Sequence, residues 1–223
     1  MKKRRNKGFT LAEVLITLVI IGVIGALTVP VLIQNTKKEE YVSALKKTYS
    51  TLSQAAQAII AEEGSPKCSD GGWACSSEAV YEQFKKHLHN AKECNLNSGC
   101  WAQGSFYYLN GQRDTGTWAA ESAFRKLILA DGTQLLFLDF INADCTAESH
   151  GSNGFCAEII TDINGARKPN KAGYDMFIFV LKENGIYPMG CDTRGYDCTN
   201  FAAAGGSGHG CACKVLTEGA INY

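Results

Sequence analysis

The first 33 residues constrain this chain most, because a basic start leads directly into a long apolar run. Residues 14–33 carry no charge, and Glu13 is the single acid in the run that begins at Phe9. At 1.5 Å per helical residue, about twenty apolar residues cross the hydrocarbon core of a bilayer. The sequence therefore predicts a membrane-spanning helix over residues 9–33.

The position of the one small-residue junction separates this segment from an ordinary secretory signal, whose cleavage site follows its apolar region. Here the junction, at Gly8, precedes the apolar run. Cleavage at Gly8 would remove the charges and keep the helix. Five basic residues precede the span, and the positive-inside rule holds that end in the cytoplasm. They are Lys2, Lys3, Arg4, Arg5 and Lys7.

The segment Lys-Gly-Phe-Thr-Leu-Ala-Glu, with the apolar run and Pro30 behind it, resembles the N-terminus of type IV pilins and type II secretion pseudopilins. The resemblance implies that a prepilin peptidase cuts between Gly8 and Phe9 and that the new amine of Phe9 is methylated. It assigns assembly to Glu13 and Pro30. An ionised carboxylate in hydrocarbon is costly unless paired, and the implied partner is the Phe9 amine of a neighbouring subunit. The alternative is that Glu13 simply reaches the headgroups.

Pattern and resemblance together divide the chain into four parts. Pro30 should kink or locally melt the long helix rather than end it, whereas Gly64 and Pro66 should end it. The four parts are a cleaved basic leader at 1–8, a transmembrane and polymerisation helix at 9–33, an amphipathic extension at 34–63, and an extracytoplasmic head at 64–223.

The head shows one further helical pattern and several strand patterns. Apolar spacing predicts a helix over residues 78–94. Asp131-Gly132 and Asn184-Gly185 predict hairpin turns, because type I′ geometry needs positive φ. Strands are expected at 127–130, 133–140, 156–163 and 176–182, with a further extended segment after Gly185. The resemblance implies an α+β fold, in which the long helix packs on an antiparallel sheet of about four strands with disulfide-rich loops.

All ten cysteines lie beyond the span, in a compartment where disulfides persist, and their even number predicts five bridges. The alternative use of two of them is a zinc site at Cys211 and Cys213 near His209, although a second well-spaced pair is missing. Short spacings favour Cys68 with Cys75, Cys94 with Cys100 and Cys145 with Cys156, and leave Cys191, Cys198, Cys211 and Cys213 to pair among themselves.

One loop of the head carries oxygen ligands at spacings that a calcium ion could use, namely Asp162, Asn164 and Asp175. It resembles an acidic loop of some pseudopilins, but Gly173 stands where an EF-hand needs a bidentate Glu. The alternative is a turn-rich connection in which Asp and Asn bond their own backbone. No other cofactor is expected.

The remaining composition favours neither nucleic-acid binding nor catalysis. After the five leader charges are subtracted, 17 basic residues face 22 acids, so the exported part is mildly acidic. No catalytic triad, phosphate-binding loop or metalloprotease motif is present in the sequence. An aromatic cluster admits two interpretations, a core segment or a sugar platform. It comprises Trp101, Phe106, Tyr107 and Tyr108.

The sequence thus predicts a non-enzymatic structural subunit of a pilus-like filament or a secretion pseudopilus. Its expected partners are like subunits, the prepilin peptidase and an inner-membrane assembly platform. It should cross the inner membrane once with its head in the periplasm, and then enter a periplasmic pseudopilus or a surface pilus. The alternative is a minor tip subunit whose head is a binding module for adhesion or DNA uptake.

Overall fold

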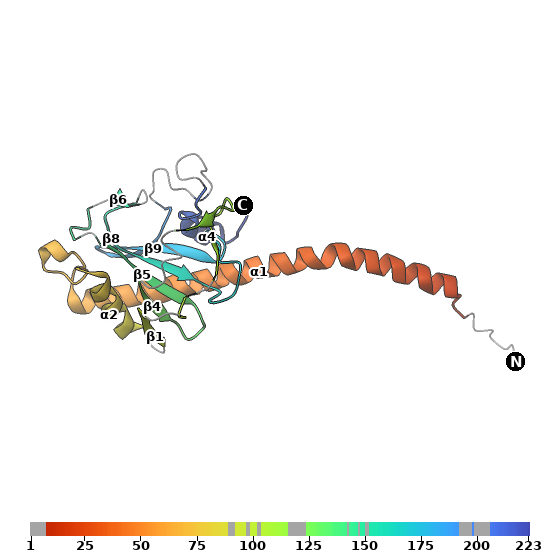
Figure 1. The fold of residues 1–223 in the computed structure, drawn as a ribbon, viewed down its shortest axis with the longest axis horizontal. Helices are drawn as coiled ribbons and strands as arrows, with labels where there is room; N and C mark the ends of the chain where they lie inside the picture. Colours follow the sequence, from red (N-terminus) through yellow and green to blue (C-terminus); the bar gives the residue numbers. More distant parts are fainter. Residues whose placement is uncertain are drawn as a thin grey trace. The chain divides into compact units, whose positions relative to one another are not determined.

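The computed structural model contains two compact units, Met1–Glu39 and Glu40–Tyr223, and each is described by itself. One helix, α1 (Leu11–Glu63), contributes to both (Figure 1). The residues that the structure describes are 8–88, 92–96, 99–101, 104–115, 124–141, 143–146, 148–149, 152–191, 198 and 206–223.

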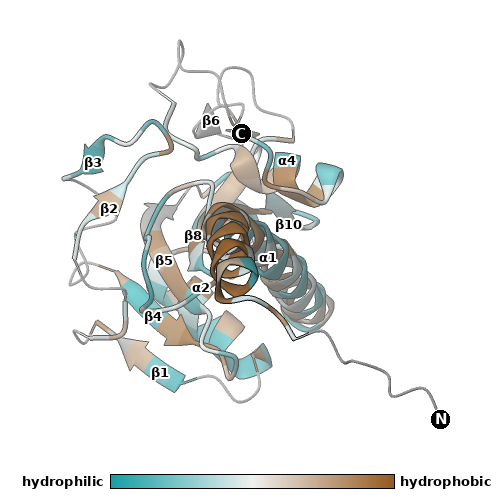
Figure 2. Cartoon of the chain, turned by 90° about the vertical axis from the view of Figure 1, so that its right-hand side faces the viewer, coloured by the Kyte–Doolittle hydropathy of each residue, from teal (hydrophilic) through white to brown (hydrophobic). Residues whose placement is uncertain are grey.

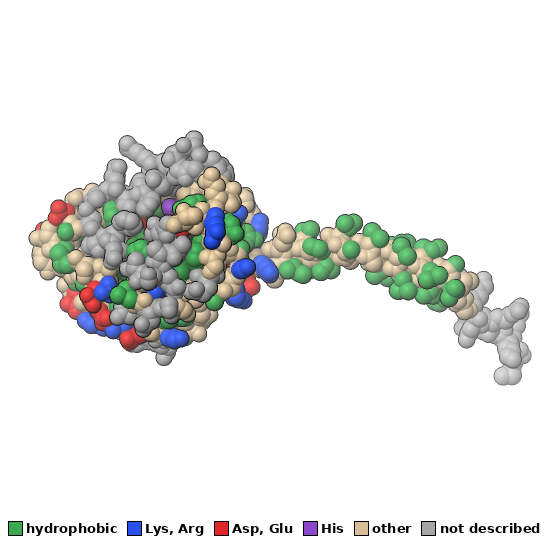
Figure 3. Space-filling view, in the orientation of Figure 1, with side chains coloured by type: hydrophobic (Ala, Val, Ile, Leu, Met, Phe, Trp, Pro, Cys, Tyr) green, Lys and Arg blue, Asp and Glu red, His purple; other side chains and the backbone are tan. Residues whose placement is uncertain are grey.

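In the first unit, α1 presents apolar side chains to its surroundings (Figure 3). Leu11 is 81% exposed and Leu27 is 71% exposed. The helix continues through Pro30, so the expected local melting is not seen, although this residue has no N–H to donate to the carbonyl of Ala26. The described part of the chain has one helix long and apolar enough to cross a membrane.

In the second unit, α1 buries one face and ends where the sequence predicts. Its last helical residue is Glu63, and Gly64 follows with a φ of 82° and an N–H bond to Ile60 O. A left-handed residue at this position is a common helix stop. The buried face consists of Tyr41, Val42, Leu45, Thr48, Leu52, Ala55, Ala56 and Ile59.

Within the described residues, six strands form the main sheet in the order β1-β4-β5-β8-β9-β10, and every neighbouring pair is antiparallel. The expected antiparallel sheet is confirmed, with six strands in place of about four, because the short strands β1 and β10 extend its two edges. The bounds are β1 Lys92–Asn95, β4 Arg125–Ile128, β5 Gln134–Ile141, β8 Phe155–Asp162, β9 Met176–Lys182 and β10 Gly185–Pro188.

Both predicted hairpins are present, but the expected type I′ geometry is wrong: in each dipeptide only the glycine has a positive φ, whereas type I′ needs one at Asp131 and at Asn184 as well. At the first, Gly132 has a φ of 90°, Leu129 N bonds Thr133 O, and Thr133 N bonds Asp131 Oδ1. At the second, Gly185 pairs with Lys182 and leads directly into β10. The β4–β5 and β9–β10 connections were therefore readable from two dipeptides.

Side-chain alternation gives the sheet two apolar faces. Leu135 and Phe137 of β5 face a core shared with α1 and α2 (Ser77–His87), whereas Leu136 and Leu138 face a second core. A two-stranded ribbon, β2 (Phe106–Tyr107) with β3 (Arg113–Asp114), contributes Phe106 to the second core. Figure 2 shows this ribbon on the side of the sheet away from α1.

Four smaller elements complete the described head. A 3-10 helix, η1, is stapled by a disulfide, and α4 carries two of the cysteines. The elements are η1 (Cys68–Asp70), β6 (Glu148–Ser149), β7 (Ser152–Asn153) and α4 (Cys211–Glu218).

The helix expected over residues 78–94 is shorter than predicted. It begins after Ser76, whose Oγ accepts a hydrogen bond from Ala79 N, and it ends at His87. Lys92–Asn95 instead forms β1, which pairs with β4. Ladder hydrogen bonds and the Cys94–Cys100 disulfide fix this segment as strand and override its helical spacing.

The ten cysteines, all of which the structure describes, form five disulfides. The zinc interpretation is therefore wrong, because the sulfurs of Cys211 and Cys213 are both used in bridges. The pairs are Cys68–Cys75, Cys94–Cys100, Cys145–Cys156, Cys191–Cys213 and Cys198–Cys211. Three are the short-range pairs that spacing favours, and the last four cysteines pair among themselves in a nested arrangement.

Candidate functional site

The start of α1 is held by a reciprocal pair of side-chain bonds between Thr10 and Glu13. Glu13 Oε2 accepts bonds of 2.8 Å from both the backbone N–H and the hydroxyl of Thr10. Thr10 Oγ1 in turn accepts from Glu13 N at 3.3 Å. This is a capping box, which satisfies backbone donors that the first turn of a helix leaves without partners.

The capping box gives Glu13 a local role that the sequence interpretation missed, although Thr-x-x-Glu before an apolar run is its sequence signature. The carboxylate that would pair with a neighbouring subunit is held beside residues that flank the proposed cut. Phe9 is 87% exposed and directly precedes Thr10, so no described side chain covers the junction with Gly8. The structure thus places a fixed acid close to an accessible junction.

In the head, the residues predicted to hold calcium lie together in a buried polar cluster between β8 and β9. Asn164 Nδ2 donates to Asp175 Oδ2 at 2.7 Å, and Asn164 N donates to Asp162 Oδ1 at 3.2 Å. Asp175 also accepts from the backbone of Asn170 at 2.9 Å and of Lys171 at 2.6 Å. The side chain of Asp175 therefore organises the loop.

The cluster is attached to α1. Asn164 Nδ2 reaches Tyr41 OH at 3.2 Å, and Arg167 Nη2 lies 3.9 Å from Glu40 Oε1. Tyr41 also meets the ring of Tyr174 edge-on, with 5.6 Å between the centroids. These contacts fix the loop against the first turns of α1 that belong to the head.

Burial dominates the electrostatics of the two carboxyl groups. Burial raises the pKa of Asp162 well above its ordinary value, and the nearby Asp175 charge raises it further. Burial also raises the pKa of Asp175 to about 6, against hydrogen bonds from the loop backbone that lower it. A nearby positive charge would favour the ionised form of both groups and offset the effect of burial.

The oxygens of this cluster are of the kind that hard cations bind. Several buried oxygens have no hydrogen-bond partner, namely Asp162 Oδ2, Asn164 Oδ1 and Asn170 Oδ1. Asp162 is fully buried and Asn170 is 1% exposed. Among the described residues no group of three His, Cys, Asp or Glu side chains is arranged around one point, so amide oxygens would have to complete the site. Carboxylate and amide oxygens suit calcium.

The raised pKa values predict how stability depends on pH when no divalent cation is present. An acid with a raised pKa in the folded state favours folding at low pH and loses that contribution as pH rises. For Asp175 the loss falls between about pH 4 and about pH 6 and amounts to roughly 2 to 3 kcal/mol. Guanidinium unfolding in a chelator should therefore give a lower free energy of unfolding at pH 7 than at pH 4. This decrease in the free energy of unfolding with pH should be smaller for Asp162→Asn. An equal slope in Asp162→Asn and in exposed Asp70→Asn would contradict this.

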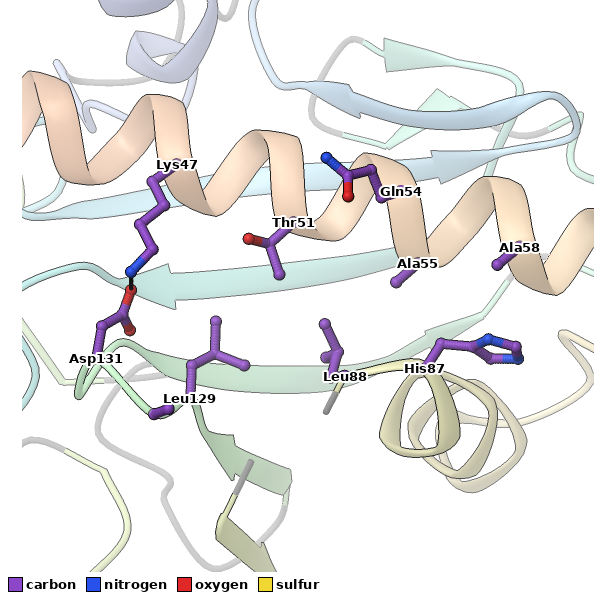
Figure 4. A pocket seen from close by; sticks show the side chains of 10 residues that line it. Lys47, Thr51, Gln54, Ala55, Ala58, His87, Leu88, Leu129 and Asp131 are labelled. Atoms are coloured by element: carbon purple, nitrogen blue, oxygen red, sulfur yellow. Dashed lines mark ion pairs between the residues drawn. The ribbon is translucent and has the colours of Figure 1, made fainter. Parts of the chain in front are cut away.

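A groove of about 440 Å³ runs along α1 in the head (Figure 4). Most of the side chains that α1 contributes to its wall are small, and His87 and Leu88 line the opposite side. The ion pair between Lys47 Nζ and Asp131 Oδ2, 2.8 Å apart, lies at one end. These two charges neutralise each other, and at the other wall His87 Nε2 lies 3.3 Å from Glu62 Oε2.

The structure divides the aromatic cluster between the two interpretations. Trp101 and Phe106 lie in the second core and are 1% and 4% exposed. Tyr108 donates its hydroxyl to Asp114 Oδ1 at 2.6 Å. Tyr107 points away from the core and is 39% exposed. The platform interpretation therefore applies to Tyr107 alone.

The exposed apolar helix and the antiparallel head define a pilin-like α+β class. Residues 3–29 match the family model described as the prokaryotic N-terminal methylation motif. The chain is also 44% identical over 45 residues to the type II secretion system core protein G of Aeromonas hydrophila. The alignment covers 20% of this chain and 32% of that relative, so the chain spans about a third of the relative's length. No solved structure matches the chain. The resemblance seen in the sequence is confirmed: this chain carries a pilin-type N-terminal methylation segment.

Proposed function

We propose that this chain is a non-enzymatic structural subunit of a pilus-like filament or a type II secretion pseudopilus. A prepilin peptidase cuts between Gly8 and Phe9, and the new Phe9 amine is methylated. The subunit crosses the inner membrane once with its head in the periplasm. An inner-membrane assembly platform then adds it to like subunits through residues 9–33.

The observation that carries the proposal is the combination of the methylation segment with an exposed apolar helix and a separate disulfide-bonded head. A helix with this much exposed apolar surface requires either lipid or other apolar helices around it. Membrane insertion followed by helical assembly supplies the two environments in turn. The disulfides agree with a head outside the cytoplasm.

Processing is tested first at the residue before the cut. Gly8→Val should leave the full precursor in the membrane, because the peptidase must accommodate a residue without a side chain there. Mass spectrometry of the N-terminus checks this directly. Wild-type protein should begin at methylated Phe9, and Gly8→Val protein should keep Met1 or Lys2.

A matched substitution outside the junction, Gly22→Val, keeps the same added volume and should be cut normally, since nothing lies within 4 Å of a Cβ placed at Gly22. An uncut N-terminus in wild-type cells that contain the peptidase would overturn the processing step.

We also propose that Asp162, Asn164 and Asp175 hold a calcium ion that stabilises the head. The support is the set of buried oxygens without partners and the raised pKa values of both carboxyl groups. The ion would supply the positive charge that keeps both carboxylates ionised.

Calcium should then raise the melting temperature of the purified chain above its value in a chelator, because a ligand that binds only the folded state stabilises it by mass action. Asp162→Asn keeps the bond from Asn164 N and should lose the calcium-dependent shift. Asp131→Asn, which removes an acid at the groove instead, should keep it. Equal melting temperatures with calcium and with chelator would exclude the site.

A further inference from the structure

A second pocket lies beside Tyr107, on the face of the sheet away from α1. Its volume is about 410 Å³, within the range of small-ligand sites. We call it the Tyr107 pocket, and it is lined by Ser105, Tyr107, Gly111, Lys168, Pro169 and Lys171.

The walls of the pocket are held by backbone bonds between the ribbon and the β8–β9 loop. Tyr107 N donates to Asn170 O at 3.0 Å, and Ala172 N donates to Tyr107 O at 2.9 Å. The buried carboxylate of Asp175 fixes the loop by accepting hydrogen bonds from the backbone N–H groups of Asn170 and Lys171. Tyr107 and Lys171 thus lie next to each other and form an isolated parallel β-bridge.

The charges at this pocket are all positive and have no ion-pair partner among the described residues. Lys168 is exposed and Lys171 is partly exposed. Arg113 is the cross-strand partner of Tyr107, and both are exposed on the same face of the ribbon. By contrast, neighbouring Arg167 has an acidic partner in Glu40. Two lysines therefore line the pocket beside an exposed aromatic ring, with Arg113 next to that ring, and this arrangement complements an anionic ligand.

We propose that the Tyr107 pocket binds an acidic saccharide, a sugar that carries a carboxylate on its ring. The apolar face of a sugar ring packs on the Tyr107 ring, and its carboxylate meets the two lysines. Ser105 Oγ and the loop backbone beside Gly111 supply hydrogen bonds to ring hydroxyls. Tyr107 is 39% exposed and Lys168 is exposed, so a ligand can reach the pocket from solvent.

The same features disfavour a nucleic acid. Single-stranded nucleic acids bind grooves in which several aromatic rings stack successive bases, and this pocket exposes one. DNA also carries a much higher charge density than a chain of carboxylated sugars, and the exported part of the protein has 17 basic residues against 22 acids. A local cationic pocket on an acidic protein suits a sparsely charged ligand.

The test is a titration of the full-length chain in detergent with oligogalacturonate, a chain of carboxylated hexoses. Saturation-transfer NMR and calorimetry should detect binding, whereas the uncharged methyl ester should bind much more weakly. Lys168→Gln/Lys171→Gln should weaken binding about tenfold or more. Tyr107→Ser should weaken it similarly, and Tyr107→Phe should keep it, because only the ring is needed.

The matched control is Lys46→Gln/Lys92→Gln, which removes the same charge from two other exposed lysines and should bind as the wild type does. Equal affinity of the two double variants would overturn the site. Tighter binding of an equally charged DNA oligonucleotide, lost in Lys168→Gln/Lys171→Gln, would overturn the ligand class. Because binding is measured on unassembled protein, failure to form filaments would count against the proposed function and not against this pocket.

Discussion

Glu13→Gln protein is expected to be cut after Gly8 and to accumulate in the membrane, but to enter filaments poorly. If Glu13 pairs with the Phe9 amine of a neighbouring subunit, as the resemblance implies, removing the carboxylate leaves that amine unpaired as the helix leaves the lipid. A buried charge without a partner costs roughly 3 to 5 kcal/mol. Insertion itself should survive or improve, because a charge inside a membrane is unfavourable.

The capping box makes this substitution informative. Gln at the third helical position can accept from the Thr10 N–H and hydroxyl as Glu13 does, so the helix start is preserved while the charge is lost. Thr10→Val has the opposite effect, because it removes the hydroxyl and keeps the charge. It should weaken the helix start by about 1 kcal/mol and still permit assembly.

The measurement compares sheared filaments with the membrane pool by quantitative mass spectrometry. Glu39→Gln, an exposed acid further along α1, serves as the control and should assemble normally. Wild-type proportions of Glu13→Gln in filaments would mean that Glu13 has no partner in the assembly and serves only as a helix cap.

The second large effect is expected from the C-terminal disulfides. Cys198→Ala/Cys211→Ala should lower the free energy of unfolding by about 3 to 5 kcal/mol. The bridge closes a separation of 13 residues, and Cys211 is fully buried, so its loss also leaves a void. A Cβ at Gly173 would lie only 2.7 Å from Cys211 Sγ, which shows how closely this sulfur is packed.

Cys68→Ala/Cys75→Ala provides the comparison, because this bridge closes a separation of 7 residues and Cys75 is exposed. Its removal should cost about 2 kcal/mol. Guanidinium unfolding under oxidising conditions, monitored by tryptophan fluorescence, gives the unfolding midpoints of the two variants for comparison. Equal midpoints would show that burial of Cys211 adds nothing to the bridge.

Much of the fold could be predicted because local chemistry and tertiary packing agree. The apolar run at 14–33 leaves little choice but an exposed helix, and Asp131-Gly132 encodes a turn that the β4–β5 pairing then uses. Close cysteine spacing restricts pairing for geometric reasons. The cut between Gly8 and Phe9 and the assembly role of Glu13 stay predictions.

What could not be predicted depends on partners distant in the chain. The local pattern of Lys92–Asn95 predicts a helix, but the segment forms a strand because it pairs with β4. The exposed side of Tyr107 depends on which face of the short β2–β3 ribbon covers the second core. Neither fact is contained in the local pattern. The capping box at Thr10 differs, because Thr-x-x-Glu before an apolar run is a local signal that predicts it directly.

The two apolar faces of the sheet have an evolutionary consequence. Leu135 and Phe137 pack in the core that contains α1, the helix that a filament would share among all its subunits, whereas Leu136 and Leu138 pack in a second core formed by strands and loops of one head. Mutations that reshape the ribbon of Phe106 and Tyr107 therefore leave the helix-facing core unchanged. A gene duplicated from this one could acquire a new outer surface and still polymerise with its parent.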